Sequence, residues 1–364
     1  MPRSLQPDPA VRLPASVRLD ESFRPPPWLR NRHVQSIVPS LPARFRWMAS
    51  RLAPLLATGR TLLLDCGDGV RLQAIHSPAR RVAGETMRDS AGERVAVLLH
   101  GWEGSADSLY VLSLAAQLNE RGCDVVRLNL RDHGGTHHLN RELFHSCRLP
   151  EVIGAVRHIQ ALFPGASLGL AGFSLGGNFM LRVAAEAGPA RLRIEKVVAI
   201  SPVLDPIATL ESLERGFRPY HSYFIRKWTR SLRLKEKAWP DEYEFATLVH
   251  LPGLRALTAE LVRRFTSFAS LEDYLNGYAI VGARLAALQV PSTIITSLDD
   301  PIIPARDIGR LAPSPALHVV VTRWGGHCGF LDHLSRWTWA ERRAAAELAR
   351  APQLGASSPA RTGT

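Results

Sequence analysis

Residues 172–176 read Gly-Phe-Ser-Leu-Gly, and the serine at their centre has the setting in this chain that most favours nucleophilic chemistry. A short apolar run at 166–171, typical of a buried strand, precedes them, and residues 177–186 have the pattern of a helix. A strand that turns directly into a helix needs glycine on both sides of the serine, because side chains there would collide across the turn. Such a turn holds the hydroxyl of Ser174 clear of the sheet and points the N–H of Leu175 to where an oxyanion would form. The pattern therefore predicts a serine nucleophile.

A serine hydroxyl becomes an effective nucleophile when an imidazole accepts its proton and a carboxylate orients that imidazole. Two later segments end in residues of these types. The strand expected at 292–297 leads to Asp299 and Asp300, and the strand expected at 317–322 leads to two glycines and His327. The carboxyl ends of parallel strands are where ligand-facing residues gather in open sheets of this kind. We therefore expect His327 to be the base.

Two adjacent aspartates could supply the acid. We favour Asp300, because the spacing Asp-Pro-hydrophobic-hydrophobic-Pro at 300–304 is typical of the acid position. Asp299 stays an alternative, and either carboxylate could instead cap the helix expected over residues 305–311.

A second backbone donor for the oxyanion is expected after the strand at 94–99, where residues 100–104 read His-Gly-Trp-Glu-Gly. The N–H of Trp102 is the candidate, beside that of Leu175. The chain order serine, aspartate, histidine is the order of the α/β-hydrolase fold, in which the nucleophile stands on a strand-to-helix turn. Four features in this order predict that fold and a Ser174–Asp300–His327 triad.

The elements that must position these residues alternate along the chain. A hairpin is expected around the Gly-Asp-Gly at 67–69, between strands 61–66 and 70–76. Further strands are expected at 94–99, 123–130, 166–171, 196–200, 292–297 and 317–322, and helices at 108–121, 150–163, 305–311 and 334–349. Alternation of this kind predicts a mainly parallel central sheet flanked by helices.

The alternation breaks between about 203 and 288, a stretch that is helical in pattern and rich in arginine and aromatic residues. We expect a lid over the active site there, although helices packed on the sheet edge are the alternative. The proline-rich residues 1–25 predict a flexible N-terminal segment, residues 26–350 the hydrolase domain, and residues 351–364 a flexible tail.

Composition excludes several classes of protein. Hydrophobic residues make up 46% of the 364 residues, and the longest apolar runs are far too short to span a membrane. The N-terminus is polar and has no apolar signal core, so we expect a cytoplasmic protein. Four cysteines without a Cys-x-x-Cys spacing favour free thiols over a disulfide framework.

The formal net charge of +12 comes almost entirely from arginine. A bias in nucleotide composition explains such an excess, and so does attraction to anionic lipid surfaces or acidic ligands. Cations alternate with aromatic residues over 215–237, which supports weak peripheral association with an anionic membrane. No recognised reader motif accompanies the charge, so we expect no nucleic acid as partner.

Several blocks of the chain resemble the YheT-like α/β-hydrolases, the bacterial relatives of the eukaryotic ABHD serine hydrolases, over about residues 23–346. The blocks lie at 25–39, 100–104, 129–134, 172–176, 298–301 and 325–330. The resemblance implies a serine hydrolase of carboxylic esters, either short-chain esters or lipid-like acylglycerols, and no cofactor. The chain departs from the family at Asp132, where many relatives have glycine, and at Trp102-Glu103.

Three other interpretations use parts of the same sequence. The histidines at 133, 137, 138 and 145, with Asp132, could suggest a metal site, but we expect none. The spacing His327-x₄-Asp332 resembles a pattern linked with acyl transfer, which would use the same acyl-enzyme. A catalytically inactive binding module on the same fold is the third. We favour hydrolysis of a small-molecule ester or lipid.

Overall fold

The computed structural model describes residues 13, 17–80, 94–334 and 336–350. Their strands form one sheet in the order β1-β2-β4-β3-β5-β6-β7-β8. The hairpin β1–β2 and the pair β2–β4 are antiparallel, and all other neighbouring pairs are parallel. This confirms the mainly parallel sheet expected from the sequence. The strands are β1 (Arg60–Asp65), β2 (Arg71–Ser77), β3 (Arg94–Leu99), β4 (Asp124–Leu128), β5 (Ser167–Phe173), β6 (Ile194–Ile200), β7 (Ser292–Ser297) and β8 (Leu317–Thr322).

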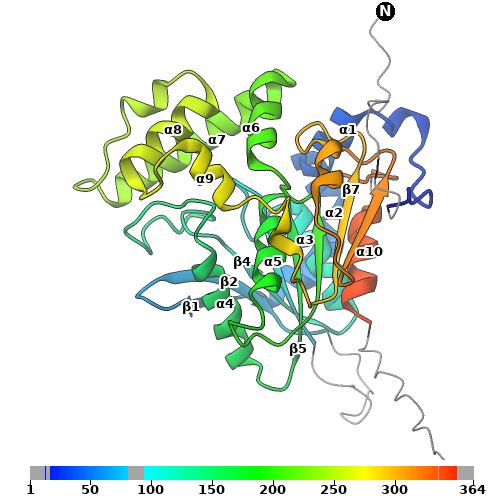
Figure 1. Ribbon diagram of the computed structural model, residues 1–364. Helices are drawn as coiled ribbons and strands as arrows, with labels where there is room; N and C mark the ends of the chain where they lie inside the picture. The colour runs from blue at the N-terminus through cyan, green and yellow to red at the C-terminus, as the bar shows by residue number, and fades with distance from the viewer. Residues whose placement is uncertain (1–12, 14–16, 81–93, 335, 351–364) are drawn as a thin grey trace, which may run out of the picture.

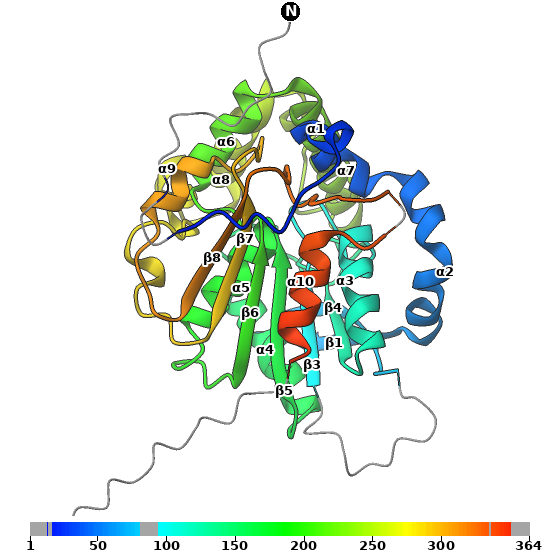
Figure 2. The same cartoon turned by 90° about the vertical axis from the view of Figure 1, so that its right-hand side faces the viewer.

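Helices cover both faces of the sheet, so its central strands are apolar on both sides. In β3, Val95 and Val97 belong to the core on one face, while Ala96 and Leu98 belong to the core on the other. Figure 2 shows α10 and α3 in front of the sheet and α4 and α5 behind it. The bounds of these helices are α3 (Leu109–Glu120), α4 (Leu149–Leu162), α5 (Leu175–Ala185) and α10 (Trp339–Leu348).

The N-terminal part contains helices that precede the sheet. They are η1 (Pro27–Leu29), α1 (Arg32–Ile37), η2 (Val38–Ser40) and α2 (Pro42–Thr58). The long helix α2 was not among the expected elements. Its buried residues Met48, Leu52 and Leu55 lie at i, i+4 and i+7, a helical spacing that the proline at position 54 helps to obscure. These side chains pack into the core shared with α3.

Two expected helices differ in the structure. The segment after β7 is a 3₁₀ helix, η5 (Ala305–Arg310), rather than an α-helix. The last helix begins at Trp339, five residues later than expected, because Thr338 and Glu341 form a capping box at its start.

A helical insertion lies between β6 and β7, in the stretch where the alternation of the sequence breaks. It comprises α6 (Pro206–Arg215), α7 (Arg218–Ala238), η3 (Leu248–His250), α8 (Gly253–Phe265), α9 (Leu271–Gly277) and η4 (Ala283–Leu285). Part of it has a small core of its own, which includes Leu232, Phe245 and Leu261. Figure 1 shows these helices gathered at one end of the sheet.

The N-terminal segment is attached earlier than the sequence suggested. Residues 1–12 and 14–16 lie outside the described residues, as does the expected tail at 351–364. However, the N–H of Asp20 donates to the carbonyl of Val321 at 2.7 Å, and Phe23 is only 2% exposed. The expectation of a flexible segment up to residue 25 is therefore wrong for residues 20–25, because Phe23 packs against Phe330 and Trp339.

No helix in the described part of the chain is both long enough and apolar enough to cross a bilayer.

Candidate active site

Ser174 stands at the junction of β5 and α5, with backbone angles φ 52° and ψ −119°. A non-glycine residue rarely adopts such a conformation, which marks strain that the surrounding packing must hold. A Cβ at Gly172 would collide with the backbone of Gly176, and a Cβ at Gly176 would collide with the carbonyl of His100. The two glycines are therefore required by close backbone contacts, as the sequence pattern suggested.

A chain of hydrogen bonds joins Ser174, His327 and Asp300. The Nε2 atom of His327 lies 2.9 Å from the hydroxyl of Ser174, and its Nδ1 atom lies 2.9 Å from Oδ2 of Asp300. The other oxygen of Asp300 accepts hydrogen bonds from the backbone N–H groups of Ile302 and Ile303. The side chain of Asp300 is completely buried, and that of His327 is 12% exposed. These contacts fix the carboxylate and align the ring with the hydroxyl.

Burial alone would lower the pKa of His327. The carboxylate of Asp300 raises this pKa through its charge and its hydrogen bond, and the net shift is upward. The pKa of His327 is raised well above its usual value of 6.5, because Asp300 stabilises the charged ring. An imidazole with a raised pKa is a strong proton acceptor for the serine hydroxyl.

The alternative acid, Asp299, has a different place. Its Oδ1 atom accepts a hydrogen bond of 2.9 Å from the backbone N–H of Gly326, and its Oδ2 atom has no partner among the described residues. Burial raises the pKa of Asp299 to about 6. This side chain supports the loop that carries His327, whereas the ring itself contacts Asp300.

Helix α1 holds the same loop from the other side, a role that the sequence analysis did not assign. The hydroxyl of Ser36 accepts a hydrogen bond of 2.8 Å from the backbone N–H of His327. The amide of Gln35, completely buried, exchanges two hydrogen bonds with the backbone of Leu331. A Cβ at Gly329 would collide with the carbonyl of Gln35. The block at 25–39 thus includes the supports of the histidine loop, and its resemblance to a family block was the only signal.

The two backbone groups expected to hold an oxyanion lie at the same cavity as Ser174. Trp102 and Leu175 both line it, and Leu175 is the first residue of α5, where N–H groups lack partners within the helix. The loop after β3, which contains Trp102, packs closely against the serine, since a Cβ at Gly101 would lie 3.2 Å from the Cβ of Ser174. The indole of Trp102 stacks on Phe224 of α7, with ring centroids 5.2 Å apart.

The cavity has a volume of about 1110 Å³. Ser174 and His327 line it together with residues of α1, α2, α6, α7, α8 and α9, so the insertion and the N-terminal helices both enclose it. Its lining is largely apolar and includes Leu210, Leu254 and Leu275. Such a cavity suits an extended apolar ligand whose reacting group lies at the serine.

The structure explains the aspartate at position 132, where the chain departs from the pattern of the family that it resembles. Asp132 has a positive φ of 59°, and its carboxylate lies 2.9 Å from Nζ of Lys235 on α7. Both side chains are buried, and the ammonium group also donates to the carbonyls of Asn140 and Glu142. The pair therefore ties the insertion to the loop that follows β4.

The other interpretations can be placed on the structure. In the described residues, no three His, Cys, Asp or Glu side chains are arranged to hold a metal ion. His133 bonds to Glu103 N–H and lies 2.7 Å from the carbonyl of Arg131. Asp332, of the spacing linked with acyl transfer, forms an ion pair with Arg342 and does not line the cavity.

A family model described as the alpha/beta hydrolase fold matches residues 95–334, about two thirds of the chain. Together with the sheet order and the serine turn, this match shows that the chain belongs to the α/β-hydrolase family. Among curated proteins it is similar to the putative esterase YheT of Escherichia coli strain K12, with 26% identity over 88% of this chain and 91% of that protein. The resemblance to YheT-like hydrolases is thereby confirmed.

A second curated relative is phospholipase ABHD3 of Mus musculus, 24% identical over 67% of this chain. The match spans only 60% of the length of that phospholipase. Two solved structures share the fold. One is 2,6-dihydroxy-pseudo-oxynicotine hydrolase, with a TM-score of 0.54, 16% identity, and coverage of 84% of this chain and 72% of that one. The other is a bacterial membrane phospholipase A, with a TM-score of 0.51, 18% identity, and coverage of 87% and 94%.

Proposed function

We propose that this protein hydrolyses carboxylic esters through an acyl-enzyme formed on Ser174. The observation that supports this most strongly is the continuous hydrogen-bond chain from the Ser174 hydroxyl through both ring nitrogens of His327 to Asp300. A serine so connected can lose its proton to the ring as its oxygen attacks a carbonyl.

The reaction takes two steps. In the first, the Ser174 oxygen bonds to the ester carbonyl carbon and its proton passes to Nε2 of His327. The tetrahedral oxyanion is held by the N–H groups of Trp102 and Leu175, and it collapses as the ring gives its proton to the leaving alcohol. In the second, His327 takes a proton from water, the hydroxide adds to the acyl carbon, and the acid leaves as the proton returns to Ser174. Asp300 orients the ring and stays ionised throughout. The steps need no cofactor.

The substrate class that we propose is an ester with an apolar acyl chain, including lipid-like esters. The large apolar cavity around Ser174 supports it, since it can accommodate an extended chain. The names of two relatives, an esterase and a phospholipase, point to the same class. We propose that the insertion at 203–288 acts as a lid, because α7 covers the cavity where Phe224 stacks on Trp102.

The mouth of the cavity supports peripheral association with an anionic membrane. Ile37, Leu41, Phe45 and Tyr223 line the cavity and are also exposed. The stretch 27–58 around three of them contains five arginines and no acidic residue. Aromatic and basic side chains at the entrance of a lipid site fit the polar surface of an anionic bilayer. The cytoplasmic location stays a prediction from the N-terminal composition.

This association has its own test, which is the sedimentation of the protein with phospholipid vesicles. Binding is expected to vesicles that contain phosphatidylglycerol, to weaken with salt, and to fall for Trp47→Ser, which removes an exposed ring of α2. Leu162→Ser is the matched control, since Leu162 is similarly exposed but belongs to α4, which packs on the other face of the sheet from α2. Equal loss in both variants would contradict a specific membrane-facing side.

The hydrolase itself is tested by a fluorophosphonate probe and a p-nitrophenyl ester series of increasing chain length. Wild type is expected to be labelled and to release p-nitrophenol, whereas Ser174→Ala should do neither, because the triad acts as a unit. Near-wild-type rates in purified Ser174→Ala would refute the assignment. Absence of labelling in folded wild type would favour the binding module instead. A primary alcohol added to the assay forms a new ester only if the enzyme transfers the acyl group to it. Detection of this ester therefore distinguishes acyl transfer from hydrolysis.

A further inference from the structure

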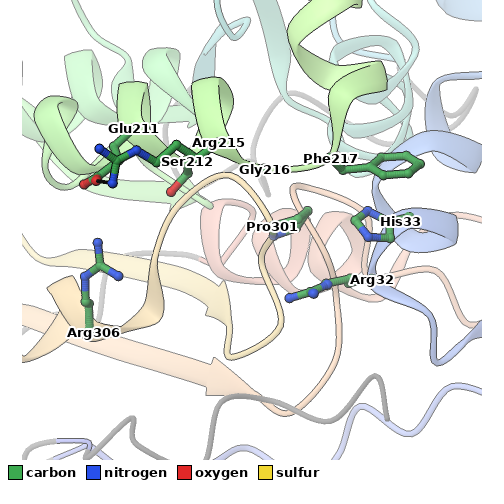
Figure 3. A pocket seen from close by; sticks show the side chains of 9 residues that line it. All are labelled: Arg32, His33, Glu211, Ser212, Arg215, Gly216, Phe217, Pro301 and Arg306. Carbon is green, nitrogen blue, oxygen red and sulfur yellow. Dashed lines mark ion pairs between the residues drawn. The ribbon is translucent and has the colours of Figure 1, made fainter. Parts of the chain in front are cut away.

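A second, smaller pocket of about 500 Å³ lies on the outer side of the wall that encloses the catalytic cavity. Figure 3 shows Arg32 beneath Pro301, Arg306 farther to one side, and Arg215 above on α6, beside Glu211. These three arginines come from three separate elements, α1, η5 and α6. Their position around one pocket is therefore a product of the tertiary fold rather than of neighbouring positions on one helix.

The positive charge of the pocket is only partly neutralised. Arg215 pairs with Glu211 at 2.6 Å, one turn earlier on α6. The guanidinium groups of Arg32 and Arg306 have no hydrogen-bond or ion-pair partner within the part of the chain that the structure describes. Burial lowers the pKa of His33, which also lines the pocket, so that ring adds no charge near neutral pH. The pocket thus keeps a net positive charge and free donors.

The same elements build the catalytic cavity from their other sides. On α6, Arg215 faces this pocket, while Leu210 and Leu213 line the catalytic cavity. Pro301 follows the acid, Asp300, directly in the chain. A group bound here would therefore contact both the insertion and the loop of the acid.

The pocket is also connected to the histidine loop. The carbonyl of Arg32 accepts a hydrogen bond of 2.7 Å from the hydroxyl of Ser36, which in turn accepts the N–H of His327. Ser36 thus joins the backbone of Arg32 to the backbone of His327.

We propose that this pocket binds a phosphate-bearing anion that joins helix α6 to the elements supporting Asp300 and His327. A phosphate group offers several oxygens in different directions, and guanidinium groups bind such oxygens with two parallel hydrogen bonds each. The pocket presents guanidinium groups from three elements to such oxygens. A phosphomonoester and the headgroup of a phospholipid supply the same chemistry. The anion is a second ligand, separate from the ester at Ser174.

The test measures binding of inorganic phosphate, pyrophosphate and soluble dihexanoyl phosphatidic acid at constant ionic strength. The readouts are calorimetric affinity and the shift in melting temperature, with amide exchange of α6 as a local probe. Arg32→Gln and Arg306→Gln are each expected to weaken binding about tenfold, because each variant loses a charge-assisted hydrogen bond to the anion. Glu211→Gln should strengthen it, because Arg215 is then free. Arg233→Gln, an exposed arginine of α7 outside the pocket, is the matched control.

Saturable binding that is lost in Arg32→Gln and Arg306→Gln and kept in Arg233→Gln would support the site, as would slower exchange in α6. Tighter binding of the lipid than of pyrophosphate would identify a headgroup, and the reverse a soluble phosphate compound. No saturable binding, or equal loss in all three arginine variants, would overturn the proposal. The variants are at the surface, and unchanged melting temperatures without ligand show that they fold. Repeating the titration with Ser174→Ala separates this site from the hydrolase, since binding there needs no active serine.

Discussion

The backbone N–H of His327 donates to the hydroxyl of Ser36, 291 positions earlier in the chain. This contact links helix α1 to the loop that follows β8. It also explains why glycine occupies position 326, since a Cβ there would lie 2.7 Å from the same hydroxyl. Ser36 does not bond to the reacting ring, so it acts as a positioning residue.

Ser36→Ala should lower kcat for a p-nitrophenyl ester about three- to tenfold and leave KM nearly unchanged, because one supporting hydrogen bond of about 1 kcal/mol is lost. The fluorophosphonate labelling rate should fall in parallel. Ser36→Thr keeps a hydroxyl and is the control that should recover part of the rate. An unchanged kcat in Ser36→Ala, with normal folding, would show that Asp299 and Gln35 suffice to hold the loop.

Asp300→Asn should lower kcat by about 10³- to 10⁴-fold, because the ring loses both its orienting partner and the charge that stabilises its protonated form. Asp299→Asn should lower kcat by less than about tenfold, since an asparagine oxygen can still accept the N–H of Gly326. Steady-state kinetics of the two variants decide the assignment. The opposite ranking would move the acid to Asp299.

The pH profile of kcat/KM should reflect the raised pKa of His327. The ring accepts a proton only in its neutral form, so activity should fall as the pH decreases through this pKa. Because that pKa lies above the usual 6.5, the fall should begin above pH 6.5. In the residual activity of Asp300→Asn the midpoint should shift to lower pH. A wild-type midpoint below 6.5 would contradict the role of Asp300 in the free enzyme.

Asp299→Asn should stabilise the fold at pH 8. Burial raises the pKa of Asp299 from 3.8 to about 6, so the folded protein binds this proton more tightly than the unfolded chain does. The stability contributed by the proton is present below pH 3.8 and is lost as the pH rises through about 6. The ionised group then costs on the order of 3 kcal/mol, which asparagine avoids. Denaturant unfolding at pH 8 and pH 4 tests this. A gain of equal size at both values would point to a cause other than ionisation.

Lys235→Met should destabilise the protein by about 3–5 kcal/mol, because it leaves the buried carboxylate of Asp132 without its partner. Asp132→Asn combined with Lys235→Met should recover much of this loss, since no charge is then buried. A double-mutant cycle in urea gives the coupling energy. Additive losses would mean that the pair does not hold α7 to the loop after β4.

Local patterns in the sequence determined much of the fold and named the residues that the structure brings together. Ser174 and His327 could be found because a sharp turn needs glycines and because loops after parallel strands meet at one edge of the sheet. The strands were recognisable for a different reason: a strand buried on both faces needs a continuous apolar run. Helix α2 escaped notice because a proline interrupts its pattern.

Other features of the site were decided only by the tertiary structure, because they depend on contacts between residues far apart in the chain. Asp299 and Asp300 are neighbours with the same chemistry. The spacing of residues 300–304 favoured Asp300 but left Asp299 open, and packing determines that Oδ2 of Asp300 faces the ring. The support of His327 by Ser36 and the position of Arg32 and Arg306 at one pocket join segments far apart in the chain. No local spacing predicts such contacts, because they depend on how the helices and loops pack around the sheet.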